Sequence, residues 1–346
     1  MLGNFFIIVA IVSCVLSIIF YYKSIQKEKF LLFARFSYYS LTFFTICASV
    51  YLLYLILTHQ YQFNYVFEYS SNELTLGLLI SSFFAGQEGS FLLWTLFASI
   101  LGLFIIKSIS KYEGYEERVM LVFSFTVLFL LVMINPLFKN PFTLLWSESV
   151  FVNVNHLNPY YLNVPFIQNN LFFDSNSTNY YLEINSQLIN YLDNNNLYLD
   201  NLVINGNGLN PLLQNFWMQI HPPILFGGFA LAGVIYSLTI GITLKNKFIA
   251  LIKIIRPWLL TFLFVLGIGL ITGAYWSYGV LGWGGYWGWD PVENSSLIPW
   301  LIGIAALHIL IIKKSGSENE NILLKTCVFL LISIYITVIY STFLTR

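Results

Sequence analysis

A segment of eighteen residues, Trp283–Trp300, concentrates the residue types best suited to holding a flat ligand. It contains four tryptophans, one tyrosine and three glycines. Glycines between the rings leave backbone room for a planar molecule, and large aromatic rings supply apolar walls for it. The alternative is an interfacial aromatic belt, because Trp and Tyr favour that depth in membrane proteins. The candidate cofactor-binding residues are Trp283, Gly284, Gly285, Tyr286, Trp287, Trp289, Asp290, Pro291, Glu293, Asn294 and Trp300.

Two histidines are the candidate metal ligands. His221 precedes Pro222 and Pro223, and we expect these prolines to prevent a helix from continuing upstream and to fix the angle of the chain. His308 lies inside the apolar run 297–312, about 15 Å from its start, where ionisable residues are costly and usually functional. Each is predicted to bind a metal or heme iron, unless it merely makes a hydrogen bond at the interface or to a neighbouring helix.

The remaining polar candidates have simpler explanations. Asp290, Glu293 and Asn294 are suited to capping the helix that follows them. Glu88 opens another apolar run, where it either stabilises a helix N-terminus or contacts a partner or heme. We expect His59 and His156 to be ordinary surface residues. No side chain stands out as a catalytic acid or base, so none is assigned.

The amino-acid composition predicts that the chain is a membrane protein. Hydrophobic residues make up 58% of the 346 residues and charged residues 9%, and the mean hydropathy is +0.73. A soluble domain carries roughly a quarter charged residues. The net charge of zero and the lack of a basic run argue against nucleic-acid binding. None of the three cysteines forms a CxxC pair, which argues against a thiol redox centre, a zinc site or a c-type cytochrome.

Apolar runs long enough to cross a membrane predict an all-α fold, a polytopic bundle of about eight transmembrane helices with outer-side loops. The runs are 4–22, 37–57, 89–107, 119–137, 223–244, 257–275, 297–312 and 325–344. The first has no basic region before it, so we interpret it as a span and not as a signal peptide. A shorter run, 74–84, is expected at the interface or as a re-entrant segment.

Basic residues lie in alternate loops, with Lys139 as the exception, and predict the sidedness of the chain. By the positive-inside rule, the N-terminus and the loops 138–222 and 276–296 face the outer side. We divide the chain into N-terminal transmembrane helices (1–137), an Asn-rich outer loop or insertion (138–216) and a core (217–346) that contains His221, the loop 276–300 and His308.

These residues together resemble the heme-handling membrane proteins that share a tryptophan-rich "WWD" signature, and within them the CcmF family, the heme lyase subunit of cytochrome c maturation. The matching blocks, in the family's order, are 86–94, 140–142, 208–214, 221–223 and 283–300, followed by 305–308. The run Trp-Asp-Pro-Val-Glu-Asn at 289–294 distinguishes this family from the shorter heme-export relatives.

The resemblance implies that the WWD loop presents heme for covalent attachment to apocytochrome c. It implies His221 as one ligand of the presented heme and His308 as one ligand of a resident, non-covalent b-type heme. In the family the second ligand of each heme lies further along, but no histidine follows His308 here. We therefore expect a split protein, whose partner chain resembles the C-terminal part of CcmF and supplies the second histidine of each pair. Apocytochrome c, other maturation subunits and membrane lipid are the further expected partners.

The amino-acid composition of the chain is rich in Asn, Phe, Tyr and Ile, which resembles that of proteins encoded in AT-rich mitochondrial genomes. It favours the mitochondrial inner membrane, with the WWD loop facing the intermembrane space, over a bacterial inner membrane with a periplasmic WWD loop. Three other functions remain open: a heme transporter or chaperone, a non-catalytic structural subunit of a respiratory complex, and a proton-coupled transporter. The last fits least, because such transporters usually need several buried carboxylates within their spans.

Overall fold

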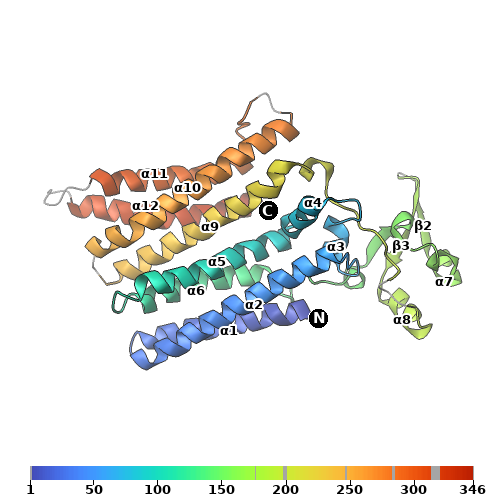
Figure 1. The fold of residues 1–346 in the computed structure, drawn as a ribbon, viewed down its shortest axis with the longest axis horizontal. Coiled ribbons are helices and arrows are strands. Elements are labelled where there is room, and N and C mark those ends of the chain that lie inside the picture. Colours follow the sequence, from blue (N-terminus) through green and yellow to red (C-terminus); the bar gives the residue numbers. More distant parts are fainter. Residues whose placement is uncertain are drawn as a thin grey trace.

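Eight long helices form the body of the computed structural model. The structure describes every residue except 1, 176, 198–200, 246–247, 283–284, 313–319 and 346. The long helices are α1 (Leu2–Ser24), α2 (Leu31–Leu57), α5 (Gln87–Ile109), α6 (Glu116–Met133), α9 (Phe216–Thr243), α10 (Phe248–Val280), α11 (Pro291–Ile312) and α12 (Glu320–Thr345). They lie side by side along the long axis of the molecule (Figure 1). The predicted polytopic helical bundle is confirmed.

Seven of these helices are long and apolar enough to cross a membrane, among the residues described. The eighth, α6, has 18 residues and begins with Glu116, Glu117 and Arg118. At 1.5 Å per residue it is about 27 Å long, just short of the roughly 30 Å hydrocarbon core. Its first turn is held by Arg35 of α2, whose Nε donates to Glu116 at 2.7 Å. The eight predicted apolar runs therefore all form helices, and seven of them meet the criteria for spans.

Helix α9 lies at the centre and packs against α5, α6, α10 and α12. Helices α1, α2, α5 and α6 lie on one side of it, and α10, α11 and α12 on the other (Figure 1). Close approach depends on small residues, as is usual between membrane helices. A Cβ at Gly241 of α9 would lie 2.6–2.7 Å from atoms of Val119 in α6, so only glycine permits this crossing.

Short elements close one end of the bundle, which we call the tryptophan end because the loop 281–290 also lies there (Figure 1). They are α3 (Asn64–Tyr69) and α4 (Leu76–Ser81), whereas α7 (Pro165–Asn169) and α8 (Ser186–Asn194) lie beyond that end (Figure 1). The run 74–84 forms α4 and a 3₁₀ turn, Ser82–Phe84, and does not span. This agrees with the interfacial or re-entrant placement expected from the sequence.

The Asn-rich segment is more ordered than a loop or biased insertion. It forms an antiparallel sheet of β1 (Val150–Asn153), β2 (Leu171–Asp174) and β3 (Asn179–Ile184) in the order β1-β3-β2. The side chains of Val152 in β1 and of Leu182 and Ile184 in β3 are fully buried. Backbone hydrogen bonds such as Asn207 N to Phe67 O, 2.8 Å, tie the segment to α3. The predicted all-α bundle is thus joined by a small sheet that the sequence did not predict, and the sheet stands beyond the end of the bundle (Figure 1).

Candidate functional site

His221 lies within helix α9, five residues after its start. Asn215 caps the helix, because its side-chain oxygen accepts from the backbone N–H of Trp217 at 2.9 Å. Pro222 and Pro223 are inside the helix. The expectation that these prolines prevent an upstream helix is therefore wrong. Proline already has a helical φ, and membrane helices tolerate the donors it lacks where neighbours or ordered waters satisfy the freed carbonyls.

The ring of His221 is fixed by helix α10. Its Nδ1 lies 2.9 Å from the carbonyl oxygen of Gly269. A carbonyl can only accept, so Nδ1 carries the proton and Nε2 of the neutral ring keeps a free lone pair. Among the described residues Nε2 makes no hydrogen bond. An imidazole whose second nitrogen donates to a backbone carbonyl is the usual arrangement of a metal-binding histidine.

Gly273 provides the space that this ring occupies. A Cβ at position 273 would lie 2.5 Å from Cε1, 2.9 Å from Nδ1 and 3.1 Å from Nε2 of His221. Any side chain here would displace the ring. Gly269 and Gly273 stand four residues apart on one face of α10, so a single helix face both bonds and accommodates the imidazole.

A row of aromatic rings connects the His221 region to the loop. We call it the aromatic row; it consists of Phe216, Trp217, Tyr275, Tyr278 and Tyr286. Trp217 stacks on Tyr275 with 5.3 Å between ring centroids and 22° between planes. Tyr286 of the loop lies 5.3 Å from Tyr275 and 4.4 Å from Tyr278. The row gives the tryptophan end a wall of flat rings that spans α9, α10 and the loop.

Most of this row was missed from the sequence. Trp217 stands four residues before His221, a spacing that places both on one helix face, and this signal was available. Tyr275 is the last residue of the predicted run 257–275, and Tyr278 falls in the predicted outer loop 276–296, although both lie within α10. Their contacts with Tyr286 cross a loop and leave no short-range pattern.

The loop itself exposes several of its rings. Trp289 is 74% exposed and has a positive φ of 57°, which is uncommon for a bulky residue. Its ring stands edge-on to Trp287, with centroids 6.3 Å apart. The Trp287 Nε1 is buried without a hydrogen-bond partner among the described residues. A Cβ at Gly285 would meet nothing within 4 Å. Trp283 and Gly284, both predicted site residues, lie outside the described residues.

The polar residues of the loop hold its backbone. Asp290 Oδ1 accepts from the N–H of Glu293 at 2.7 Å, and Pro291 is the first residue of α11. Glu293 Oε2 accepts from the N–H groups of Gly288 and Trp289 at 2.8 and 3.0 Å. Asn294 Nδ2 donates to the carbonyl of Trp289 at 2.8 Å. Asp290 caps α11 and Glu293 reaches back to N–H groups before the helix, as the predicted capping role requires, whereas Asn294 binds a carbonyl of the loop. These three side chains fix the conformation in which Trp289 is presented.

Trp300 lies apart from the loop. It stands nine residues beyond Pro291, about 13 Å along α11. Its Nε1 donates to the carbonyl of Leu263 in α10 at 2.9 Å, and a Cβ at Gly267 would approach the same ring to 3.1 Å. Trp300 therefore fastens α11 to α10 and does not extend the aromatic row.

His308 lies in α11, towards the end of this helix that is remote from the loop 281–290. Helix α11 begins six residues earlier than the predicted run, so His308 lies about 26 Å from its start and four residues before its end. Its Nδ1 is 2.8 Å from the carbonyl of Ile304 in the same helix, and the side chain is exposed. Nδ1 is again the protonated nitrogen, which leaves Nε2 directed away from this helix turn. The structure does not bring His308 together with His221.

Glu88 has a defined partner at the tryptophan end. It lies in the first turn of α5, and its carboxylate is 3.5 Å from Nζ of Lys139. Burial, together with the charge of Glu88, raises the pKa of the nearby Glu68 carboxyl. His59 accepts or donates at Nδ1 with the Tyr61 hydroxyl at 3.0 Å. His156 is half-buried with its ring against Phe67, so it is less exposed than predicted.

The side chains at this site suit a metal that is already bound to most of its ligands, and not a bare metal ion. Within the described part of the chain, no group of three or more His, Cys, Asp or Glu side chains gathers to hold a bare ion. Heme iron has four porphyrin nitrogens and needs only one or two axial ligands from protein. A single imidazole with a fixed tautomer beside flat aromatic rings fits that requirement.

Fold and site define a polytopic helical membrane protein with a histidine beside an aromatic, tryptophan-containing end. The chain belongs to the cytochrome C assembly protein family, whose model matches residues 84–345. It is 39% identical over 144 residues to CcmF of Pseudomonas aeruginosa, covering 41% of this chain and 21% of that protein. It is 37% identical over 149 residues to CcmF of Escherichia coli K12, covering 43% and 22%.

A solved structure has the same fold. The cytochrome c heme lyase CcmF aligns with a TM-score of 0.67 and 21% identity over 97% of this chain. The aligned part is 46% of that chain, so the present chain spans less than half of the solved protein. The predicted CcmF resemblance is confirmed at the level of the family.

Proposed function

We propose that this chain is the front part of a cytochrome c heme lyase, which holds heme at the tryptophan end for attachment to apocytochrome c. His221 would hold the heme iron through Nε2, and the aromatic row and the loop would lie beside the porphyrin. The observation that supports this proposal best is the fixed His221 ring, bonded at Nδ1 to Gly269 and accommodated by Gly273. The relatives named CcmF for cytochrome c-type biogenesis agree with it.

The chain's own residues bind and orient. When bound, heme supplies the vinyl groups to which two apocytochrome cysteines add as thioethers. Gly269 keeps His221 in the tautomer that can ligate iron. Glu293 and Asn294 keep the loop backbone in place, and Trp287 offers a buried N–H without a partner to a polar group of the ligand. No proton transfer is assigned to a side chain of this protein.

A partner chain completes the site in this proposal. One histidine at each candidate heme leaves a second axial position open, and the solved relative is more than twice as long as the aligned part. The partner would resemble the remaining part of that protein and would supply the second protein ligand to the iron held by His221 and to the iron held by the exposed His308. The b-type heme at His308 is the second proposed site. Other maturation subunits bring the apocytochrome and the heme.

The proposed location is the mitochondrial inner membrane, with the tryptophan end in the intermembrane space. The Lys and Arg residues of the described turns after α1, α5 and α9 lie at the opposite end, where the positive-inside rule places the matrix or cytoplasm. The same orientation in a bacterial inner membrane would put the tryptophan end in the periplasm. Immunogold labelling of the chain in its native cells distinguishes the two membranes. Protease protection in isolated mitochondria or bacterial membrane vesicles then tests on which side the tryptophan end lies.

The test is covalent attachment in membranes that contain the chain, its partner and the other maturation subunits. Heme that stays on a CxxCH apocytochrome after denaturation measures the activity. We expect His221→Ala to abolish attachment and His59→Ala, at the same end of the bundle, to retain it. Full attachment by His221→Ala contradicts the proposal. Heme bound without attachment indicates a transporter or chaperone, and a complete complex without heme indicates a structural subunit.

A further inference from the structure

The end of the bundle opposite the tryptophan end contains a cavity of about 810 Å³. It is an open pocket, bordered by the end of α1 with the turn that follows, by the α5–α6 turn, and by the end of α9. We call it the headgroup pocket; the residues that the argument uses are Glu28, Lys111, Glu113, Glu117, Arg118 and Lys245. This pocket is separate from His221 and from the loop, and the proposed function does not use it.

A carboxylate with one unpartnered oxygen lies in the wall of the headgroup pocket. Glu117 is only 9% exposed, and its Oε2 is buried with no hydrogen-bond partner among the described residues. Its neighbour Glu116 differs, because Arg35 donates to both of its carboxylate oxygens. A buried charge without a donor is costly. The Glu117 carboxylate therefore calls for a ligand that brings positive charge and N–H donors.

Cations with unused donors surround the same pocket. Lys245 donates from Nζ to the carbonyl of Glu113 at 2.6 Å, and Arg118 donates from Nη1 to the carbonyl of Gly114 at 2.8 Å. These bonds fix the two heads but leave further N–H donors on each, and Lys111 stands beside them. Cationic donors held in this way suit a phosphate group.

The formal charges of the pocket balance. The cations Lys111, Arg118 and Lys245 face the carboxylates of Glu28, Glu113 and Glu117 in its lining. A purely anionic ligand would be repelled by the three carboxylates. A purely cationic ligand would offer no acceptor to the three basic side chains. A ligand with one phosphate and one ammonium group matches both sets.

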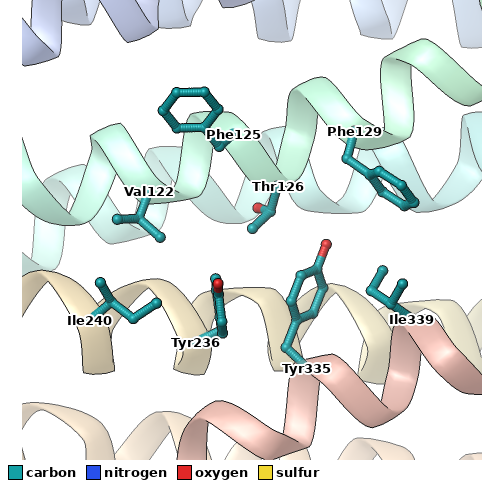
Figure 2. Close-up of a pocket in the computed structure, with 8 residues that line it drawn as sticks. All are labelled: Val122, Phe125, Thr126, Phe129, Tyr236, Ile240, Tyr335 and Ile339. Atoms are coloured by element: carbon teal, nitrogen blue, oxygen red, sulfur yellow. The ribbon is translucent and has the colours of Figure 1, made fainter.

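A separate apolar groove lies further along helix α6. Arg118 is one helical turn from Val122, which opens a groove of about 430 Å³ that extends to Phe129. Figure 2 shows its other walls, where Tyr236 projects from α9 and the Tyr335 hydroxyl is directed towards α6. From Arg118 to Phe129 the helix rises about 16 Å, close to half of the roughly 30 Å hydrocarbon core. A fatty acyl chain reaches that depth.

We propose that the headgroup pocket and this groove bind one phospholipid with a primary ammonium headgroup, as in phosphatidylethanolamine. Its ammonium group donates to Glu117, its phosphate accepts from Arg118 and Lys245, and one acyl chain lies along α6 against Tyr236 and Tyr335. Phosphatidylcholine lacks ammonium N–H donors for Glu117. Phosphatidylglycerol lacks the cation altogether. The site belongs to this chain alone and does not depend on heme.

Lipid binding by the delipidated full-length chain in detergent tests this proposal. Native mass spectrometry counts the lipids retained from mixed micelles of phosphatidylethanolamine, phosphatidylcholine or phosphatidylglycerol, and thermal unfolding gives the accompanying shift. We expect phosphatidylethanolamine to bind at least about tenfold more tightly than phosphatidylcholine, since hydrogen bonds to charged groups contribute about that factor. Glu117→Gln should abolish this preference, while Glu73→Gln, an exposed acid at the other end, should preserve it.

Lys245→Gln provides a second, independent variant, because its half-buried side chain is not needed for a packed core. It should weaken phosphatidylethanolamine and phosphatidylglycerol alike through the lost phosphate contact. Equal binding of the ethanolamine and choline lipids by the wild type would overturn the proposal, and so would unchanged binding in Lys245→Gln. Competition by acyl-free O-phosphoethanolamine at the same concentration as the lipid would overturn the assignment to a lipid.

Discussion

Replacing Gly273 by alanine places a methyl carbon against the ring of His221. The new Cβ would lie 2.5 Å from Cε1, whereas ordinary contacts begin at 3.4 Å, so the ring must retreat by about 0.9 Å. That movement disturbs the 2.9 Å bond from Nδ1 to Gly269, worth about 1 kcal/mol, and overpacking adds about 1–3 kcal/mol. We therefore expect heme to bind at least about tenfold more weakly, which corresponds to about 1.4 kcal/mol.

Gly279→Ala is the matched control, because it lies in the same helix and a Cβ there meets nothing within 4 Å. Heme titration of the chain with its partner, followed by absorbance, measures both variants. Far-ultraviolet circular dichroism and thermal unfolding verify that Gly273→Ala stays folded. Equal heme affinity of folded Gly273→Ala and Gly279→Ala would refute the reasoning about the His221 ring.

Three further predictions concern the loop, the ion pair and pH. Glu293→Ala removes the carboxylate that holds the N–H of Trp289, so limited proteolysis should cut 281–290 several-fold faster; an unchanged rate contradicts this role. Arg35→Gln leaves Glu116 buried and unpaired and should cost about 3 kcal/mol in detergent unfolding; a loss below about 1 kcal/mol contradicts it. Burial and nearby carboxylates raise the pKa of Glu68, so its contribution to stability is present at acidic pH and lost as pH rises through that pKa. Glu68→Gln should then unfold at a higher temperature than the wild type at neutral pH, and an equal or lower one contradicts the shift.

The helices were predictable because their signal is local. An apolar run of about twenty residues has to bury its backbone polar groups in its own hydrogen bonds, so each of the eight runs forms a helix. Helix ends were less accurate. The 216–243 helix begins seven residues before the predicted run because the cap at Asn215, and not the paired prolines, determines its start.

The sheet in the Asn-rich segment was not predictable by the same reasoning. Its strands have four to six residues, and the flanking Asn residues signal turns as strongly as the Phe and Tyr residues signal strands. Pairing such as Phe172 with Tyr181 is fixed by tertiary contacts. A composition bias therefore concealed a folded element.

The candidate site was predicted in part. His221 and the capping residues Asp290 and Glu293 were recognisable from residue type and spacing. The support of His221 by Gly269 and Gly273 comes from a helix about fifty residues away, and a single sequence contains no sign of that contact. Trp300 was grouped with the loop by proximity in sequence, although the helical rise carries it into the α10–α11 interface.

The most direct test of the account is the absorbance spectrum of the complex purified from its native membrane, beside His221→Ala with and without added imidazole. An imidazole in solution can occupy the space that the missing ring leaves and restore an axial nitrogen ligand. The account predicts a heme spectrum that is lost or shifted in His221→Ala and recovered on adding imidazole, with His308→Ala changing a separate component. A heme spectrum unaltered by His221→Ala would contradict the assignment of His221 as an iron ligand.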